Sequence, residues 1–142
     1  NTEKLLSRAV DFLKAHPAVR GKRIGLAVFS LGARLALALA RGKEDVIGAV
    51  VEFYGVASGT FAKYKTPVQG HFAEHDDWGA GAEAVKKLRD RLILGSGKVE
   101  FNTYPGTTHW FFEENVANAY NDQAAQLAFN RAVAFLRHWL SP

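Results

Sequence analysis

Apolar residues along this chain fall into two kinds of run. Short continuous runs rich in Val, Ile, Phe and Tyr predict strands buried on both faces, over residues 22–29, 46–55, 66–74 and 98–104. Longer runs with helical spacing predict helices over residues 2–15, 31–41, 81–94 and 122–140. Because strands and helices alternate, we expect an α/β fold. It would be one domain over residues 1–142, with a mostly parallel sheet of about four strands flanked by helices.

The carboxyl ends of the predicted strands hold the residues that could carry chemistry. Open parallel sheets bind ligands outside these strand ends. Four places on the chain fall there: Ser30, Tyr54 with Gly55, residues 74–78, and residues 105–111. An active site is therefore expected to draw on these four places.

Ser30 stands at the junction of a predicted strand and a predicted helix, in the stretch VFSLGA. A serine on such a tight turn presents its hydroxyl above the sheet, beside the free N–H groups of the next helical turn. This is the arrangement of a nucleophile elbow, which needs small residues two positions before and two positions after the serine. Gly32 meets the second requirement, but Val28 occupies the first position. We expect a slightly opened turn or a compensating small neighbour, such as Ala33 or Gly55.

A nucleophilic serine needs a base, and the base needs an acid that orients it. The chain offers both in the order Ser, Asp, His, because Asp76 follows the third predicted strand and His109 follows the fourth. Asp77 is the alternative acid. Taken singly, Ser30 or either aspartate could cap a helix, and His109 could be a partly buried loop histidine. The three together favour catalysis.

Aromatic side chains flank the proposed site and could form an apolar wall for the acyl or alcohol group of a substrate. The candidates for substrate contact are Tyr54, Trp78, Trp110 and Phe111. Core packing is the competing explanation for the tryptophans and for the neighbouring phenylalanines. We expect it to hold for at least two of these rings.

Two motifs suggest other chemistry. HFAEH at 71–75 matches a zinc-binding pattern that needs both histidines on one helical turn. On a predicted strand, however, four residues separate the two side chains by about 13 Å, too far for one zinc ion. GSGK at 95–98 lacks the glycine and the Ser or Thr of a phosphate-binding loop, and residues 95–97 are predicted to form a turn. We expect no metal and no other cofactor.

Composition limits the possible partners. Cysteine is absent, which excludes disulfides and a cysteine nucleophile. The net charge of +4 comes from scattered basic residues, which favours an ordinary solvated surface over nucleic-acid binding. No apolar run reaches the roughly 18 residues that span a membrane, and no signal peptide is evident. We therefore expect a cytoplasmic protein that binds neither nucleic acid nor membrane.

Taken together, these stretches resemble the dienelactone hydrolase family of α/β-hydrolases. The matching segments are VFSLGA, VVEFYG, TPVQGHFAEHD, VEFNTYPGTTHWFFEE and the final helix AAQLAFNRAVAFLRHWL, which together cover nearly the whole chain. The resemblance implies a hydrolase of small carboxylic esters in which Ser30 is the nucleophile, Asp76 the acid and His109 the base. The turn AEHD favours Asp76 over Asp77.

The chain departs from the family pattern in three respects. Ser30 stands where the family usually has cysteine, and Val28 replaces a glycine. The chain also matches only the carboxyl-terminal part of the family domain. The N–H of Leu31 is then the one oxyanion donor that the sequence assures. A missing second donor typically costs about 3–4 kcal/mol of transition-state stabilisation.

The partial match has a structural consequence as well, because the strand at 23–29 becomes an apolar edge of the sheet. Exposed apolar edges pair or aggregate, so we expect a homodimer that covers this edge. Two functions follow from the sequence. The first is a serine esterase or lactonase that cleaves small-molecule esters. The second is a hydrolase-like module without catalysis, which acts in binding or assembly.

Overall fold

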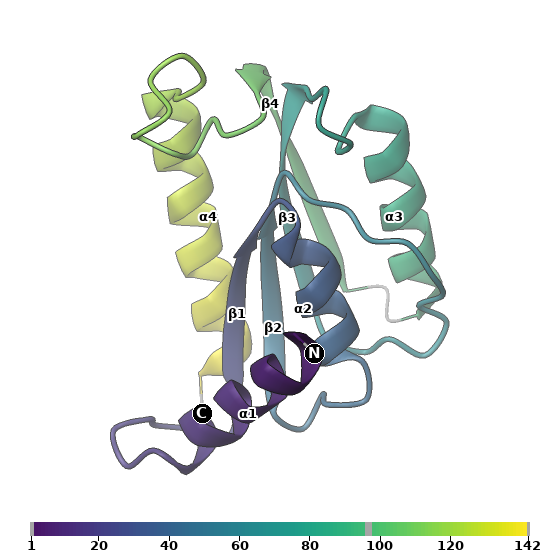
Figure 1. Cartoon of the computed structure of the whole chain (residues 1–142), viewed down its shortest axis with the longest axis vertical. Helices are drawn as coiled ribbons and strands as arrows, with labels where there is room; N and C mark the ends of the chain where they lie inside the picture. The colour runs from purple at the N-terminus through teal and green to yellow at the C-terminus, as the bar shows by residue number, and fades with distance from the viewer. Residues whose placement is uncertain (1, 96–97, 142) are drawn as a thin grey trace.

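The computed structural model describes residues 2–95 and 98–141, and this part of the chain forms four helices and four strands (Figure 1). The strands are β1 (Ile24–Phe29), β2 (Ile47–Phe53), β3 (Val68–His75) and β4 (Val99–Thr108). The helices are α1 (Thr2–Ala15), α2 (Gly32–Ala40), α3 (Ala82–Gly95) and α4 (Asp122–Leu140). The predicted α/β fold is confirmed. The turn expected at 95–97 lies mostly outside the described residues, and Gly95 itself ends α3.

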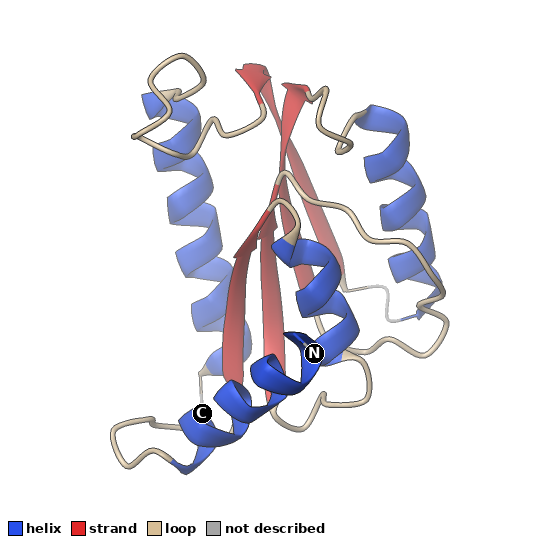
Figure 2. Ribbon diagram, viewed as in Figure 1, coloured by secondary structure: helices blue, strands red, loops and turns tan. Residues whose placement is uncertain are grey.

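The described sheet has the strand order β1-β2-β3-β4, and every neighbouring pair is parallel (Figure 2). The carboxyl ends of all four strands therefore meet at one end of the sheet, as the alternation of strands and helices predicts. β1 and β4 form its two edges. Among the described helices, none combines the length and apolar character needed to cross a bilayer.

Two apolar cores lie on opposite faces of the sheet. One packs α1, α2 and α3 against the sheet and contains Leu37, Val50 and Leu88. The other lies under α4 and contains Val51 and Ala128. Because helices cover both faces, β2 is buried at every position, which explains its nearly continuous apolar sequence.

β4 is longer than the strand predicted at 98–104, since it continues through Pro105 to Thr108. Pro105 is tolerated there because β4 is an edge strand, and the side of β4 that has no neighbouring strand needs no N–H donors. The register with β3 shifts at this point, Gly106 adopts a φ of 69°, and its N–H donates to the Glu74 carboxylate at 2.8 Å. This irregularity places His109 directly after the strand, beside the end of β3.

Candidate active site

Ser30 occupies the turn between β1 and α2 and has a left-handed backbone, with a φ of 47°. Its N–H donates to the carbonyl of Phe53 on β2 at 2.9 Å, and its own carbonyl accepts the N–H of Ala33 at 3.1 Å. The N-cap of α2 is Leu31, and no side chain caps that helix. The Ser30 hydroxyl therefore does not cap α2, although the sequence alone allowed that role.

Glycines allow the turn at Ser30 to pack tightly. A Cβ atom on Gly55 would lie 2.3 Å from the Ser30 carbonyl oxygen and 2.5 Å from the Ala33 Cβ, so only glycine fits there. A Cβ atom on Gly32 would lie 3.3 Å from the Cβ of Val28. Val28 is therefore accommodated because the residue facing it has no side chain, and Gly55 is the small neighbour that lets β2 approach.

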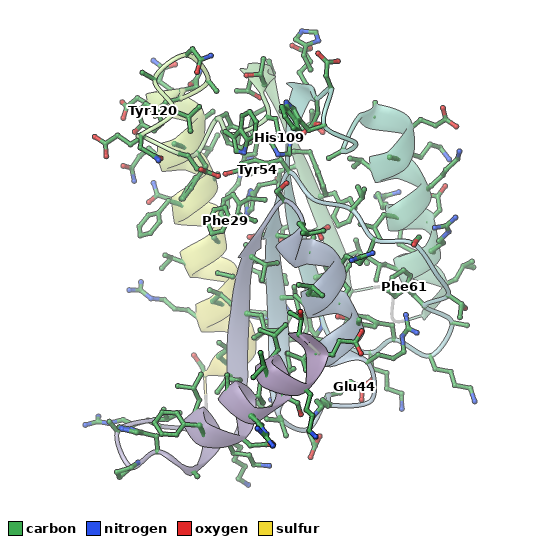
Figure 3. The ribbon with its side chains drawn as sticks, in the orientation of Figure 1. Phe29, Glu44, Tyr54, Phe61, His109 and Tyr120 are labelled. Atoms are coloured by element: carbon green, nitrogen blue, oxygen red, sulfur yellow. The ribbon has the colours of Figure 1, made fainter. Side chains whose placement is uncertain are left out.

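The structure brings Ser30, His109 and Asp76 into one chain of contacts, and Figure 3 shows His109 at the end of the sheet. The His109 Nε2 lies 3.1 Å from the Ser30 Oγ, and the His109 Nδ1 lies 2.6 Å from the Asp76 Oδ2. The side chains of His109 and Asp76 are 3% and 0% exposed. Burial from water strengthens such polar contacts, because the local dielectric is low.

The Asp76 carboxylate also orders the loop before α3. Its Oδ1 accepts the N–H of Trp78 at 2.8 Å and the N–H of Ala80 at 3.3 Å, while Oδ2 faces His109. The neighbouring carboxylate of Asp77 makes no hydrogen bond or ion pair with His109. It instead lines a cavity of about 200 Å³ that lies beside His109.

Tyr54 holds the loop that carries His109. Its ring centroid lies 4.7 Å from that of His109, and its hydroxyl donates to the Glu113 Oε1 at 2.7 Å. Burial raises the pKa of Tyr54, and Glu113 raises it further, so the hydroxyl stays protonated and remains a donor. Sequence analysis had not singled out Glu113, because a glutamate in a polar loop carries no local signal of its partner on another element.

The aromatic candidates have different environments. Trp78 is 69% exposed, and its ring lies 4.7 Å from that of Trp110. Tyr54 and Trp78 line a second cavity of about 200 Å³ that opens on Ser30 and Leu31. Phe111 is fully buried and packs against Tyr54 at 5.7 Å, so it supports Tyr54 from below rather than lining either cavity.

The segment 71–75 is part of β3, as predicted, and His71 belongs to a buried polar cluster. Its Nδ1 lies 2.7 Å from the Tyr104 hydroxyl, and its Nε2 lies 2.9 Å from the Gln69 Oε1. Burial lowers the pKa of His71 to about 3, so its ring is neutral at ordinary pH. Among the described residues, no group of three or more His, Cys, Asp or Glu is placed to hold a metal ion.

A parallel sheet covered by helices on both faces, with a serine on a strained strand-to-helix turn, defines the α/β-hydrolase class of proteins. Within that class, the family model of the dienelactone hydrolase family matches residues 1–140, and the chain belongs to this family. The resemblance that the sequence motifs indicate is thus confirmed.

Curated proteins and solved structures are similar over nearly the whole chain. "Protein usf" of Aquifex pyrophilus is 29% identical over 98% of the chain and 61% of its own length. A Bradyrhizobium protein named "Probable 2-oxo-3-(5-oxofuran-2-ylidene)propanoate lactonase" is 29% identical over 94% of the chain and 58% of its own length. The crystal structure of esterase PE8 has a TM-score of 0.73 and 23% identity, over 97% of the chain and 60% of that protein. The chain thus spans about three fifths of the length of the proteins that it matches.

Proposed function

We propose that the chain carries the catalytic centre of a serine hydrolase that cleaves small carboxylic esters. The observation that carries this proposal is the contact chain from the Ser30 Oγ to the His109 Nε2 at 3.1 Å, and from the His109 Nδ1 to the Asp76 Oδ2 at 2.6 Å. Membership of the dienelactone hydrolase family and similarity to a protein named as a lactonase support it.

In the proposed reaction, the Ser30 Oγ attacks the ester carbonyl while the His109 Nε2 takes its proton. Asp76 accepts the N–H of His109 Nδ1, which holds the tautomer that leaves Nε2 free as a base and stabilises the imidazolium that forms. His109 then gives the proton to the leaving alcohol. A water molecule, activated by the same imidazole, hydrolyses the acyl-enzyme.

The N–H of Leu31 is the proposed donor to the oxyanion of the tetrahedral intermediate. It follows Ser30 at the start of α2, and Leu31 lines the same cavity as Ser30. We place the acyl group in this cavity, where Tyr54 and Trp78 form the walls. A volume of about 200 Å³ suits a short acyl chain rather than a long one.

We further propose that a second copy of the chain covers the open edge of β1. Phe29, at the end of that edge strand, is 39% exposed. Exposed apolar residues on an unpaired strand favour association. A partner that covers this edge could also supply a second oxyanion donor near Ser30.

Hydrolysis of p-nitrophenyl acetate tests the proposed activity. We expect turnover that falls by at least about a hundredfold in Ser30→Ala, since the nucleophile is lost. Ser58→Ala is the matched control, because Ser58 is exposed in the loop after β2 and lines neither cavity beside His109 and Ser30. Equal rates in wild type and Ser30→Ala would leave only the alternative, a hydrolase-like module that binds without catalysis.

A further inference from the structure

Trp78 stands between the two cavities at the end of the sheet and lines both of them. Its backbone N–H donates to the Asp76 Oδ1 at 2.8 Å. Its ring centroid lies 4.7 Å from that of Trp110 and 6.1 Å from that of His109. Although its backbone is fixed in this way, 69% of the residue is exposed. A large aromatic surface presented to solvent at such a boundary is typical of a ligand contact.

The two cavities face different parts of the proposed catalytic centre. One opens on Ser30 and Leu31, where the carbonyl carbon and its oxyanion would lie. The other is lined by His109, which would return the proton to the leaving alcohol. If the proposed function holds, the first cavity is the acyl side and the second is the alcohol side.

The alcohol side carries one carboxylate, on a chain whose net charge is +4. Asp77 lines it with an exposed carboxylate that makes no hydrogen bond or ion pair within residues 2–95 and 98–141. No Lys or Arg of these described ranges lines either cavity, although the chain has 18 of them. His75 also lines this cavity, and its Nε2 lies 3.3 Å from the Glu74 carboxylate.

We propose that this cavity binds the alcohol portion of the ester and favours an alcohol that carries a quaternary ammonium group. The inference rests on the proposed function. Trp78 and Trp110 line this cavity, and an aromatic ring attracts a cation through its quadrupole. The Asp77 carboxylate adds a charge of opposite sign. The volume of about 200 Å³ leaves room for a small group such as trimethylammonium-ethanol.

A pair of esters of nearly equal shape tests this preference. Acetylcholine carries the cation, and 3,3-dimethylbutyl acetate replaces its nitrogen with carbon. We expect kcat/KM of the wild type to be higher for acetylcholine, and Asp77→Asn to reduce that preference about threefold to fivefold, the effect of one exposed charge. Glu114→Gln removes a charge from the loop outside both cavities and should leave the preference unchanged.

Equal kcat/KM for the two esters in the wild type would overturn the cation preference while leaving the ester hydrolase in place. If the wild type hydrolyses neither these esters nor p-nitrophenyl acetate, the proposed function fails, and binding decides the inference separately. We then expect tetramethylammonium to quench tryptophan fluorescence saturably, with a weaker affinity in Asp77→Asn than in Glu114→Gln. The absence of that difference would show that the cavity is not a cation site.

Discussion

Ser30, Tyr54 and Trp110 are the non-glycine residues with positive φ angles in the described part of the chain, at 47°, 39° and 68°. Each such residue typically costs about 1–3 kcal/mol and persists only when its surroundings hold it. Here the N–H of Ser30 donates to Phe53 and the N–H of Tyr54 donates to His71, at 2.9 and 2.8 Å. All three strained residues lie around His109, which supports the proposal that the active site is at this end of the sheet.

Glu52 raises a different question at the scale of single residues. It is the last residue but one of buried β2, is 0% exposed, and neither carboxyl oxygen has a hydrogen-bond partner among the described residues. The Tyr64 hydroxyl is buried and unpartnered in the same way. Burial raises the pKa of Glu52 well above its usual range, so the folded protein holds this carboxyl in its neutral form.

Stability should therefore fall as pH rises, and Glu52→Gln should remove that fall. The folded state binds the Glu52 proton more tightly than the unfolded state. The stability contributed by the protonated Glu52 is complete below the ordinary pKa of a glutamate. It is lost as pH rises toward the pKa of Glu52 in the folded state. We expect the free energy of unfolding of the variant to exceed that of the wild type by a margin that grows by up to about 1.4 kcal/mol per pH unit within this window.

Urea unfolding of both proteins from about pH 5, just above the ordinary pKa of a glutamate, to about pH 9 measures this margin. His71, whose pKa is lowered to about 3, changes stability only below about pH 6.5 and is common to both proteins. Stability curves that run parallel over the whole range from about pH 5 to about pH 9 would contradict a neutral buried Glu52.

At the scale of elements, the loop between β4 and α4 is held at several points. The Asn121 N–H donates to the Phe111 carbonyl at 3.0 Å, and its side chain caps α4 by accepting the N–H of Ala124 at 3.0 Å. The bond from Tyr54 to Glu113 joins the middle of this loop to the end of β2. These contacts fix the position of His109, although it lies in the long loop between β4 and α4.

The hydrophobic pattern predicted all eight helices and strands of the described chain, because periodicity is a local property of the sequence. It also predicted the strand ends at which Ser30, Asp76 and His109 lie. It did not predict the continuation of β4 past Pro105, which depends on Glu74 accepting the Gly106 N–H. Contacts of this kind join residues far apart in sequence and leave no pattern along it.

Tyr54→Phe should loosen the loop and reduce the proposed activity. The variant keeps the ring beside His109 but removes the hydrogen bond to Glu113, a bond to a charged group worth about 1.5–3 kcal/mol. We expect a similar loss in the free energy of unfolding and a kcat for p-nitrophenyl acetate lowered about threefold to tenfold. Tyr120→Phe is the control, since the Tyr120 hydroxyl bonds to Asp122 on the surface. Equal effects of the two variants would show that the loop does not depend on Tyr54.

At the scale of the whole molecule, the sheet has an open edge at β1 with an aromatic cluster at its end. The Phe29 ring lies 4.7 Å from Phe53 and 5.7 Å from Phe112, and it remains 39% exposed. The sequence predicted an apolar strand at this edge, because its pattern is continuous like that of β2. What covers the edge cannot be derived from that pattern, since pairing with another segment is a long-range contact.

Self-association through this edge should be blocked by a lysine on it. Ala27 is exposed in the middle of β1, and a lysine there opposes strand pairing by its charge. We expect light scattering to give a dimer for the wild type at micromolar concentration and a monomer for Ala27→Lys. Ala38→Lys adds the same charge on the exposed face of α2 and should stay dimeric. A monomeric wild type would contradict the proposed homodimer.

Labelling with a fluorophosphonate tests most directly the claim that Ser30 is a nucleophile activated by His109. After reaction at neutral pH, digestion and mass spectrometry locate the covalent adduct. We expect one adduct on the peptide that contains Ser30, formed at least about a hundredfold more slowly in His109→Gln, because the base is lost. An unlabelled Ser30 in a folded protein, or labelling that proceeds equally fast without the imidazole, would contradict the account.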